Sequence, residues 1–159
     1  MPTKLRYEID LSHLTSVDPP PNLRVRPISR DDLDGLASLM LDAYMGTIDY
    51  EGEDLEDAVQ EVRSFLDDPH TLMDRSFAVD DEGAIVSAVL VSLSAGEPFI
   101  GYVMTRASHK NQGLARLVTN TALEKLADDD HERVVFYITD GNAPSEALFD
   151  SLGAVRVDS

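Results

Sequence analysis

Apolar residues recur along the chain with two spacings, and the spacing predicts which segments form strands and which form helices. Six segments either alternate apolar and polar residues or are short apolar runs between turn residues, which is typical of strands. They span residues 4–9, 23–27, 77–79, 84–93, 99–105 and 133–139. Four other segments place apolar residues three or four positions apart and are expected to be helices. They span 33–44, 55–66, 115–126 and 144–152, and a last short strand is expected at 154–158.

The order of these elements predicts an α/β (α+β) fold. Three consecutive strands between residues 77 and 105 form a meander. The strand, helix and strand between 99 and 139 then form a crossover, which changes the strand direction within the sheet. We therefore expect a mixed, mostly antiparallel sheet of about six to seven strands, flanked by four helices.

An N-terminal arm precedes this arrangement. The run Asp18-Pro19-Pro20-Pro21 predicts a stiff, extended spacer. We therefore divide the chain into an arm with its spacer, over 1–21, and one domain, over 22–159. The alternating segment of the arm is expected to pair with an open sheet edge, in its own chain or in the partner subunit of a possible homodimer.

Composition excludes several kinds of site. The chain has 159 residues and no cysteine, so disulfides, thiolate metal sites and a cysteine nucleophile are ruled out. The four histidines lack the close spacing of a metal site, so no metal is expected. There is no apolar run long enough to span a membrane and no apolar stretch near the start, which leads us to expect a cytoplasmic protein.

Charge is unevenly distributed along the chain. A net charge of −17 argues against nucleic acid and anionic membranes as partners, because both are polyanions. No Asp or Glu occurs in the 26 residues from Pro98 to Leu123, where the average of 30 acidic residues in 159 predicts about 5. Four basic or titratable side chains lie in this window: Arg106, His109, Lys110 and Arg116. The window suits an anionic ligand, and the alternative is a chance effect of apolar strand composition.

The same window contains a predicted phosphate site. It reads Lys110-Asn111-Gln112-Gly113-Leu114-Ala115 and lies between a strand and a helix. The start of a helix exposes unpaired amides and a partial positive charge, which bind phosphate oxygens. Glycine lets the backbone approach the ligand, Ala115 allows close packing of the helix, and Lys110 and Arg116 can add charged contacts.

Two motifs resemble the GCN5-related N-acetyltransferase (GNAT) superfamily over residues 23–157. That family has Arg/Gln-x-x-Gly-x-Gly/Ala between its fourth strand and the next helix, and this chain has Lys110-x-x-Gly113-x-Ala115, with lysine as a departure. The later family motif is similar to Asn-x-x-Ala-x-x-Leu-Tyr-x-x-x-Gly-Phe. Here Asn142 begins the motif, Leu148-Phe149 stands where the family has Leu-Tyr, and Gly153-Ala154 ends it.

The resemblance implies acetyl-CoA as co-substrate and a role for each segment. The strands at 99–105 and 133–139 would splay apart around the thioester. Val103, Met104, Thr105 and Asn142 would contact the pantetheine arm, and residues 111–115 would hold the pyrophosphate. Asn142 is equally explained as the N-cap of the helix at 144–152.

The family comparison also implies catalytic groups. A strand amide near Met104 would stabilise the oxyanion. The tyrosine that often protonates the leaving thiolate is replaced by Phe149, so Tyr137, Tyr102 or water would take its place, or the thiolate would leave unprotonated.

The loop between the first two helices is expected to contact the acceptor. In GNAT proteins this loop overhangs the acceptor side of the notch, so by resemblance Tyr44, Asp49, Glu51 and Glu53 are acceptor residues here. Glu51 is the candidate base that takes the proton of an ammonium group. The alternative is that acids at 53–56 only favour the start of a helix.

The function expected from the sequence is transfer of an acetyl group from acetyl-CoA to a primary amine of a small molecule or peptide, by direct attack in a ternary complex. Two alternatives stay open. One is a non-catalytic acyl-CoA-binding sensor or interaction module, and the other is a structural domain without a cofactor.

Overall fold

The fold is built on one mixed sheet. The computed structural model describes residues 3–14, 16–45, 47 and 50–157, and within these residues the sheet has seven strands. They are β1 (Lys4–Asp10), β2 (Arg24–Pro27), β3 (Phe77–Asp81), β4 (Ala84–Ser94), β5 (Glu97–Thr105), β6 (Arg133–Thr139) and β7 (Val155–Arg156). Their order across the sheet is β2-β3-β4-β5-β6-β1-β7, and all neighbours are antiparallel except β5 and β6. The predicted mixed, mostly antiparallel sheet is confirmed.

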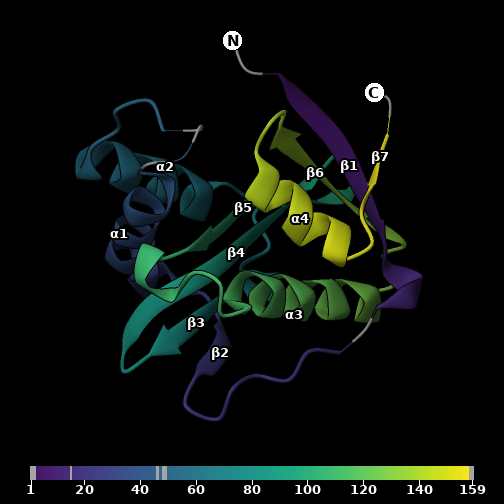
Figure 1. The fold of residues 1–159 in the computed structure, drawn as a ribbon, viewed down its shortest axis with the longest axis horizontal. Helices are drawn as coiled ribbons and strands as arrows, with labels where there is room; N and C mark the ends of the chain where they lie inside the picture. The colour runs from purple at the N-terminus through teal and green to yellow at the C-terminus, as the bar shows by residue number, and fades with distance from the viewer. Residues whose placement is uncertain (1–2, 15, 46, 48–49, 158–159) are drawn as a thin grey trace.

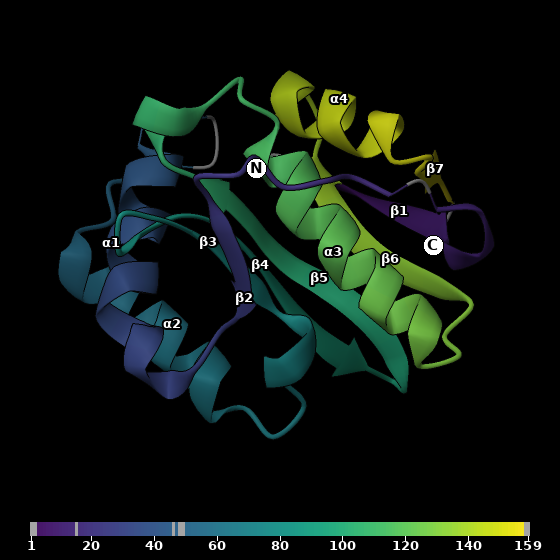
Figure 2. The same ribbon diagram turned by 90° about the horizontal axis from the view of Figure 1, so that it is seen from below.

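Helices cover both faces of this sheet. The described residues form four α-helices, as predicted: α1 (Leu33–Tyr44), α2 (Leu55–Asp67), α3 (Leu114–Asp128) and α4 (Ala143–Ser151). α1 and α2 lie on one face, and α3 and α4 lie on the other (Figure 1, Figure 2). Each face has its own apolar cluster, with Leu36 and Val62 on the first and Val118 and Phe149 on the second.

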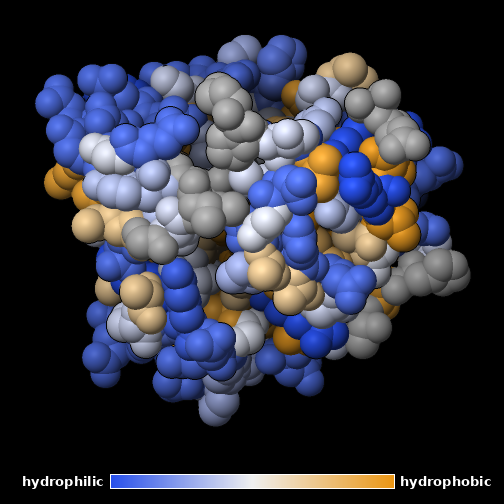
Figure 3. Space-filling model, turned by 45° about the horizontal axis from the view of Figure 1, so that its top comes forward, coloured by the Kyte–Doolittle hydropathy of each residue, from blue (hydrophilic) through white to orange (hydrophobic). Residues whose placement is uncertain are grey.

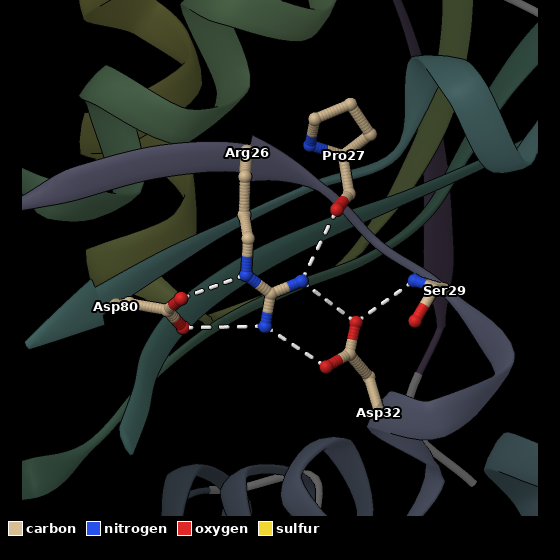
Figure 4. A network of polar contacts seen from close by, with 5 residues as sticks. All are labelled: Arg26, Pro27, Ser29, Asp32 and Asp80. Atoms are coloured by element: carbon tan, nitrogen blue, oxygen red, sulfur yellow. Dashed lines mark hydrogen bonds and ion pairs between the residues drawn. The ribbon is translucent and has the colours of Figure 1, made fainter. Parts of the chain in front are cut away.

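Charged side chains hold the turn from β2 into α1. The Arg26 guanidinium lies between two carboxylates, with Nε 2.7 Å from Asp80 Oδ2 and Nη1 2.8 Å from Asp32 Oδ2 (Figure 4). The Asp32 carboxylate also accepts the backbone N–H of Ser29 at 2.8 Å, which completes a capping box. One arginine therefore fixes the strand edge and the start of the helical segment together.

The N-terminal arm is part of the same sheet. β1 lies between β6 and β7, paired with β6 from Lys4 opposite Thr139 to Asp10 opposite Arg133. Ile9 and Leu11 are buried in the apolar cluster beneath α3. The arm thus pairs within its own chain, and it shares a core with the remainder of the fold (Figure 1).

A β-bulge in β5 lies next to the point where β5 and β6 stop pairing. β4 pairs Leu90 with Tyr102 and Val91 with Ile100, so Gly101 is an extra residue on β5. β5 and β6 pair only at Phe99 with Val135 and at Ile100 with Phe136, and both strands continue without further pairing between them. They diverge just beyond the bulge, and we call this divergence the splay.

The surface matches the acidic composition. Hydrophilic residues cover most of the face in Figure 3, and the hydrophobic residues there form small separate patches. Among the described residues, no helix is long and apolar enough to cross a membrane.

Candidate active site

A cavity of about 570 Å³ opens at the splay. Its walls come from α1, α2 and their connecting loop on one side, from β5 and β6, and from α4 and the start of β1 on the other side. The sequence-predicted residues that line it are Tyr44, Glu51, Glu53, Val103, Tyr137 and Asn142. Asp49, also predicted to contact the acceptor, lies outside the described residues. The cavity therefore brings together residues that are up to about a hundred positions apart in the sequence.

The open edge of β5 presents alternate backbone groups to this cavity. The N–H of Arg106 donates to the carbonyl of Val86 at 2.8 Å, which makes these two residues a hydrogen-bonded pair. Antiparallel ladders alternate bonded and non-bonded pairs, so Met104 opposite Ala88 is bonded and Val103 opposite Val89 is not. By this alternation the Met104 amide points at β4, and the amides of Val103 and Thr105 face the splay. The expected donor role of Met104 therefore does not fit the register, and Val103 fits it instead.

The predicted phosphate site forms the turn into α3. Gly113 is the residue before the helix and has a φ of 77°, in the left-handed region that favours glycine. No acidic residue lies in the first turn of α3, and Lys110, Asn111, Gln112 and Arg116 are all exposed. Leu114 is buried, which fixes the helix start against the core. These residues do not line the cavity itself and lie beyond the end of β5.

Two carboxylates anchor the loop between β5 and this turn. The N–H of Ala107 donates to Asp42 Oδ2 of α1 at 2.8 Å, and His109 Nε2 lies 2.9 Å from Asp81 Oδ2 of β3. Both contacts join the loop to rigid elements. The backbone of residues 110–113 is therefore held in place without using its own side chains.

The sequence matches the family model described as "Acetyltransferase (GNAT) domain" over residues 22–155. The chain belongs to the GNAT acetyltransferases.

Solved structures share the fold. A GCN5-related N-acetyltransferase from Sphaerobacter thermophilus is 17% identical with a TM-score of 0.76, over 99% of this chain and 50% of that one. The ribosomal-protein-S18-alanine N-acetyltransferase from Escherichia coli is 15% identical with a TM-score of 0.67, over 82% and 76%. AAC(6')-Iy in complex with the bisubstrate analogue CoA-S-monomethyl-acetylneamine is 14% identical with a TM-score of 0.62, over 82% and 89%. The chain thus spans half the length of the first of these, and no curated protein matches its sequence.

In this GNAT chain, the acidic wall of the cavity extends further than the sequence suggested. Asp57 and Glu61 of α2 line the cavity together with Glu51 and Glu53, and Lys4 of β1 is the single basic residue among the described lining residues. The spacing of four positions between Asp57 and Glu61 was a signal that they share one side of the helix, although it does not show what that side faces.

Hydrogen bonds order this wall. The N–H of Glu51 donates to Glu53 Oε2 at 3.0 Å, and the Tyr50 hydroxyl donates to the Glu53 carbonyl at 3.0 Å. Asp54 and Asp57 form the capping box of α2, so the acids here also serve the helix start, as the alternative interpretation held.

Tyr102 joins the acidic wall to β5. Its hydroxyl donates to Glu61 Oε1 across the cavity. Burial, the hydrogen bond to Glu61 and the negative charge of Glu61 together raise the pKa of Tyr102 above the usual range of tyrosine. The hydroxyl therefore stays protonated at neutral pH and acts as a donor.

Phe149 packs instead of donating a proton. Its ring stacks on Phe136 with centroids 3.8 Å apart, and Phe136 in turn stacks on Tyr7 of β1. Phe149 is buried and also lines the cavity. Tyr137 is 45% exposed in the same cavity, so a tyrosine hydroxyl is available on β6.

Asn142 is the N-cap of α4 and also lies at the cavity. Its Oδ1 accepts the N–H of Ser145 at 3.3 Å as the N-cap of α4, and the residue also lines the cavity. The described residues contain no cluster of His, Cys, Asp or Glu with the geometry of a metal site.

Proposed function

We propose that this GNAT chain transfers an acetyl group from acetyl-CoA to a primary amine of a small molecule or peptide, by direct attack in a ternary complex. One observation carries the proposal. A single cavity joins the open edge of β5 to an acidic wall, so a thioester and an ammonium group can meet in it.

Acetyl-CoA would supply the acyl group and bind along the splay. The carbonyl of Val103 and the free backbone groups of Thr105 would pair with the pantetheine arm as an added strand does, and Asn142 would lie beside it. The amides of residues 111–115 would hold the pyrophosphate at the start of α3, with Lys110 and Arg116 adding charge. The complex of AAC(6')-Iy with a CoA bisubstrate analogue supports this, because that protein shares the fold.

The acceptor would enter from the acidic wall. Glu51 would take the proton of the ammonium group, since only a neutral amine can attack a carbonyl carbon. Tyr44 and Glu53 would complete this side of the site. A positively charged acceptor is drawn to a cavity whose described lining carries four carboxylates and one ammonium group.

Charge on the substrate would be stabilised from β5 and β6. The Val103 amide would donate to the carbonyl oxygen as negative charge develops on it. As the C–N bond forms and the C–S bond breaks, the thiolate leaves with the electron pair of the broken bond. Tyr137 of β6 would give a proton to this thiolate, because Phe149 has no hydroxyl, and the second proton that the nitrogen loses as the amide forms would restore the Tyr137 hydroxyl.

Phe149 also favours a second candidate function. A GNAT-fold sensor that binds acyl-CoA without turnover needs no proton donor at this position, and its aromatic stack would serve packing alone. The two functions predict the same affinity for acetyl-CoA and differ only in release of CoA.

A thiol assay separates these functions. Purified protein is mixed with acetyl-CoA and, in turn, spermidine, kanamycin, lysine and a peptide with a free N-terminus. The chain has no cysteine, so every free thiol detected comes from CoA. Release of CoA that depends on both the protein and the amine supports acetyl transfer. A thermal shift with acetyl-CoA, about 2.7 kcal/mol at 100 times Kd, without any release supports the sensor.

A further inference from the structure

The side of α2 that faces the cavity carries carboxylates beyond the acceptor loop. Asp57 and Glu61 are four positions apart and line the same cavity. Glu61 lies seven residues after the N-cap Asp54, which places it about 10 Å further along the helix axis than the N-cap, whereas Glu51 and Glu53 precede the helix. Glu61 is therefore in the same cavity as Glu51 but at a separate position.

The bulge in β5 directs a hydroxyl to Glu61. In a regular strand, Ile100 and Tyr102 would lie on the same face of the sheet, because they are two positions apart, and the bulge at Gly101 breaks this alternation. Instead Ile100 packs in the cluster beneath α3 and Tyr102 packs on the side of α1 and α2. The Tyr102 hydroxyl there donates to Glu61 Oε1, which leaves the second carboxylate oxygen to accept from a ligand.

Aromatic rings line the same cavity as these carboxylates. Tyr44, Tyr50 and Tyr102 are among its lining residues, and Tyr102 contacts Glu61 directly. Aromatic faces attract cations through the ring quadrupole, and carboxylates attract them through charge. The combination of rings and acids is a composition that binds alkylammonium groups, and it is a separate observation from the number of acids.

We propose that Glu61, held by Tyr102, binds a second cationic group of the acceptor, so that the preferred acceptors carry two positive charges. This inference rests on the proposed acetyl transfer. Glu51 takes the proton of the amine that reacts, whereas Glu61 keeps its partner charged and positions it. Glu61 is thus a specificity-determining residue for diamines and related polycations, and it has no role in the chemical step.

Two amines of equal length test this directly. Hexamethylenediamine and n-hexylamine have the same carbon chain, and only the first has a second ammonium group. The wild-type protein is expected to acetylate the diamine with a kcat/KM about 10- to 100-fold higher, as a charged hydrogen bond provides. The difference should lie in KM, because a contact made equally in the ground state and the transition state changes binding alone.

Three variants test whether Glu61 is responsible for the preference for the diamine. Glu61→Gln keeps the shape of the side chain and should lose most of the preference for the diamine, while kcat/KM for n-hexylamine changes less than about twofold. Tyr102→Phe should lose a smaller part of this preference, because the Glu61 carboxylate remains but no longer accepts the hydrogen bond that positions it. Glu56→Gln is the matched control, since Glu56 is an acid of the same helix that does not line the cavity, and it should keep the full preference.

The outcomes separate this inference from the proposed function. If wild type does not distinguish the amines, or if Glu61→Gln keeps the wild-type ratio, Glu61 is not the second cation site. If Glu61→Gln lowers kcat/KM equally for both amines, the role of Glu61 is structural and the inference is overturned. If no amine releases CoA, acetyl transfer is wrong, and calorimetry with CoA-loaded protein still tests the site. If wild type binds the diamine more tightly than n-hexylamine and Glu61→Gln loses this difference, the second cation site is supported. Equal binding of both amines by wild type overturns it.

Discussion

Replacing Arg26 removes the contact that ties the first helical segment to the edge of the sheet. Arg26→Met keeps most of the aliphatic stem and removes the guanidinium. The substitution breaks the hydrogen bonds to Asp32 and Asp80 and a 3.1 Å bond to the Pro27 carbonyl. Two carboxylates are then left facing each other across the gap (Figure 4).

The expected loss of stability follows from how buried these groups are. The exposed fractions of the side chains are 22% for Arg26, 12% for Asp32 and 17% for Asp80. Exposed ion pairs contribute about 0–1 kcal/mol, and breaking a buried pair costs about 3–5 kcal/mol. For these partly buried groups we expect the free energy of unfolding to fall by about 2–3 kcal/mol. At roughly 2–4 °C per kcal/mol for a domain of this size, Tm falls by about 4–12 °C.

The loss should depend on pH in one direction. The hydrogen bond from Arg26 is the main reason that the pKa of Asp32 lies below its usual value, and burial opposes it. A lowered pKa in the folded state stabilises the protein above the unfolded value of about 3.9 and ceases to do so as pH falls through the folded value. The stability gap between wild type and Arg26→Met should therefore be constant near neutral pH and shrink below about pH 4.

Urea unfolding followed by circular dichroism measures this gap at neutral and acid pH. Arg30→Met is the matched control, because Arg30 pairs with Asp67 through side chains that are 67% and 57% exposed. We expect the control to lose less than about 1 kcal/mol. If Arg26→Met is no less stable than Arg30→Met, or if its deficit persists unchanged in acid, the reasoning is refuted.

Three further changes test other parts of the structure. Gly113→Ala forces a side chain into the left-handed region, so the free energy of unfolding should fall by about 1–2 kcal/mol and Kd for acetyl-CoA should rise. A Kd equal to that of wild type by calorimetry would contradict the phosphate site at the start of α3. Glu51→Gln should lower kcat for acetyl transfer at neutral pH by about 100-fold or more, with Kd for acetyl-CoA unchanged, and normal turnover would exclude Glu51 as the base. Ile9→Ala should cost about 2–5 kcal/mol in urea unfolding, because Ile9 is 1% exposed, and a cost near zero would show that β1 is not part of the core.

Local periodicity was enough to predict the helices and strands. Each helix repeats apolar residues along one side, and each strand of the meander is a continuous apolar run, so their signals lie within a few residues. The place of β1 could not be predicted in the same way. Its alternation indicates a strand but does not identify the partner, and the partners β6 and β7 lie more than a hundred residues away.

The bulge left a weak signal in the sequence. Gly101 lies inside an apolar run, and a glycine there often marks a bulge but does not fix the pairing on either side of it. The bulge nevertheless decides where Tyr102 points, and the bonding register decides which β5 amides face the splay. The resemblance implies a strand amide near Met104 but does not say which one, because a register depends on pairing between strands.

The acids of α2 were missed for a different reason. Asp57 and Glu61 lie on the polar side of an amphipathic helix, where charged residues are normally explained by contact with water. Only the packing of α2 across from the splay shows that this side lines a cavity. Phe149 is a different case. The sequence alone shows that the tyrosine hydroxyl is missing there, but the aromatic stack that holds the ring is visible only in the structure.

The fate of a labelled acetyl group tests the central claim most directly. Acetyl-CoA labelled in the acetyl carbonyl is incubated with the protein and an amine from the panel, and both products are quantified by mass spectrometry. We predict one labelled N-acetylamine for each CoA released, with no label left on the protein. Release of CoA with the label recovered as acetate, or binding of acetyl-CoA without any release, would contradict acetyl transfer to an amine.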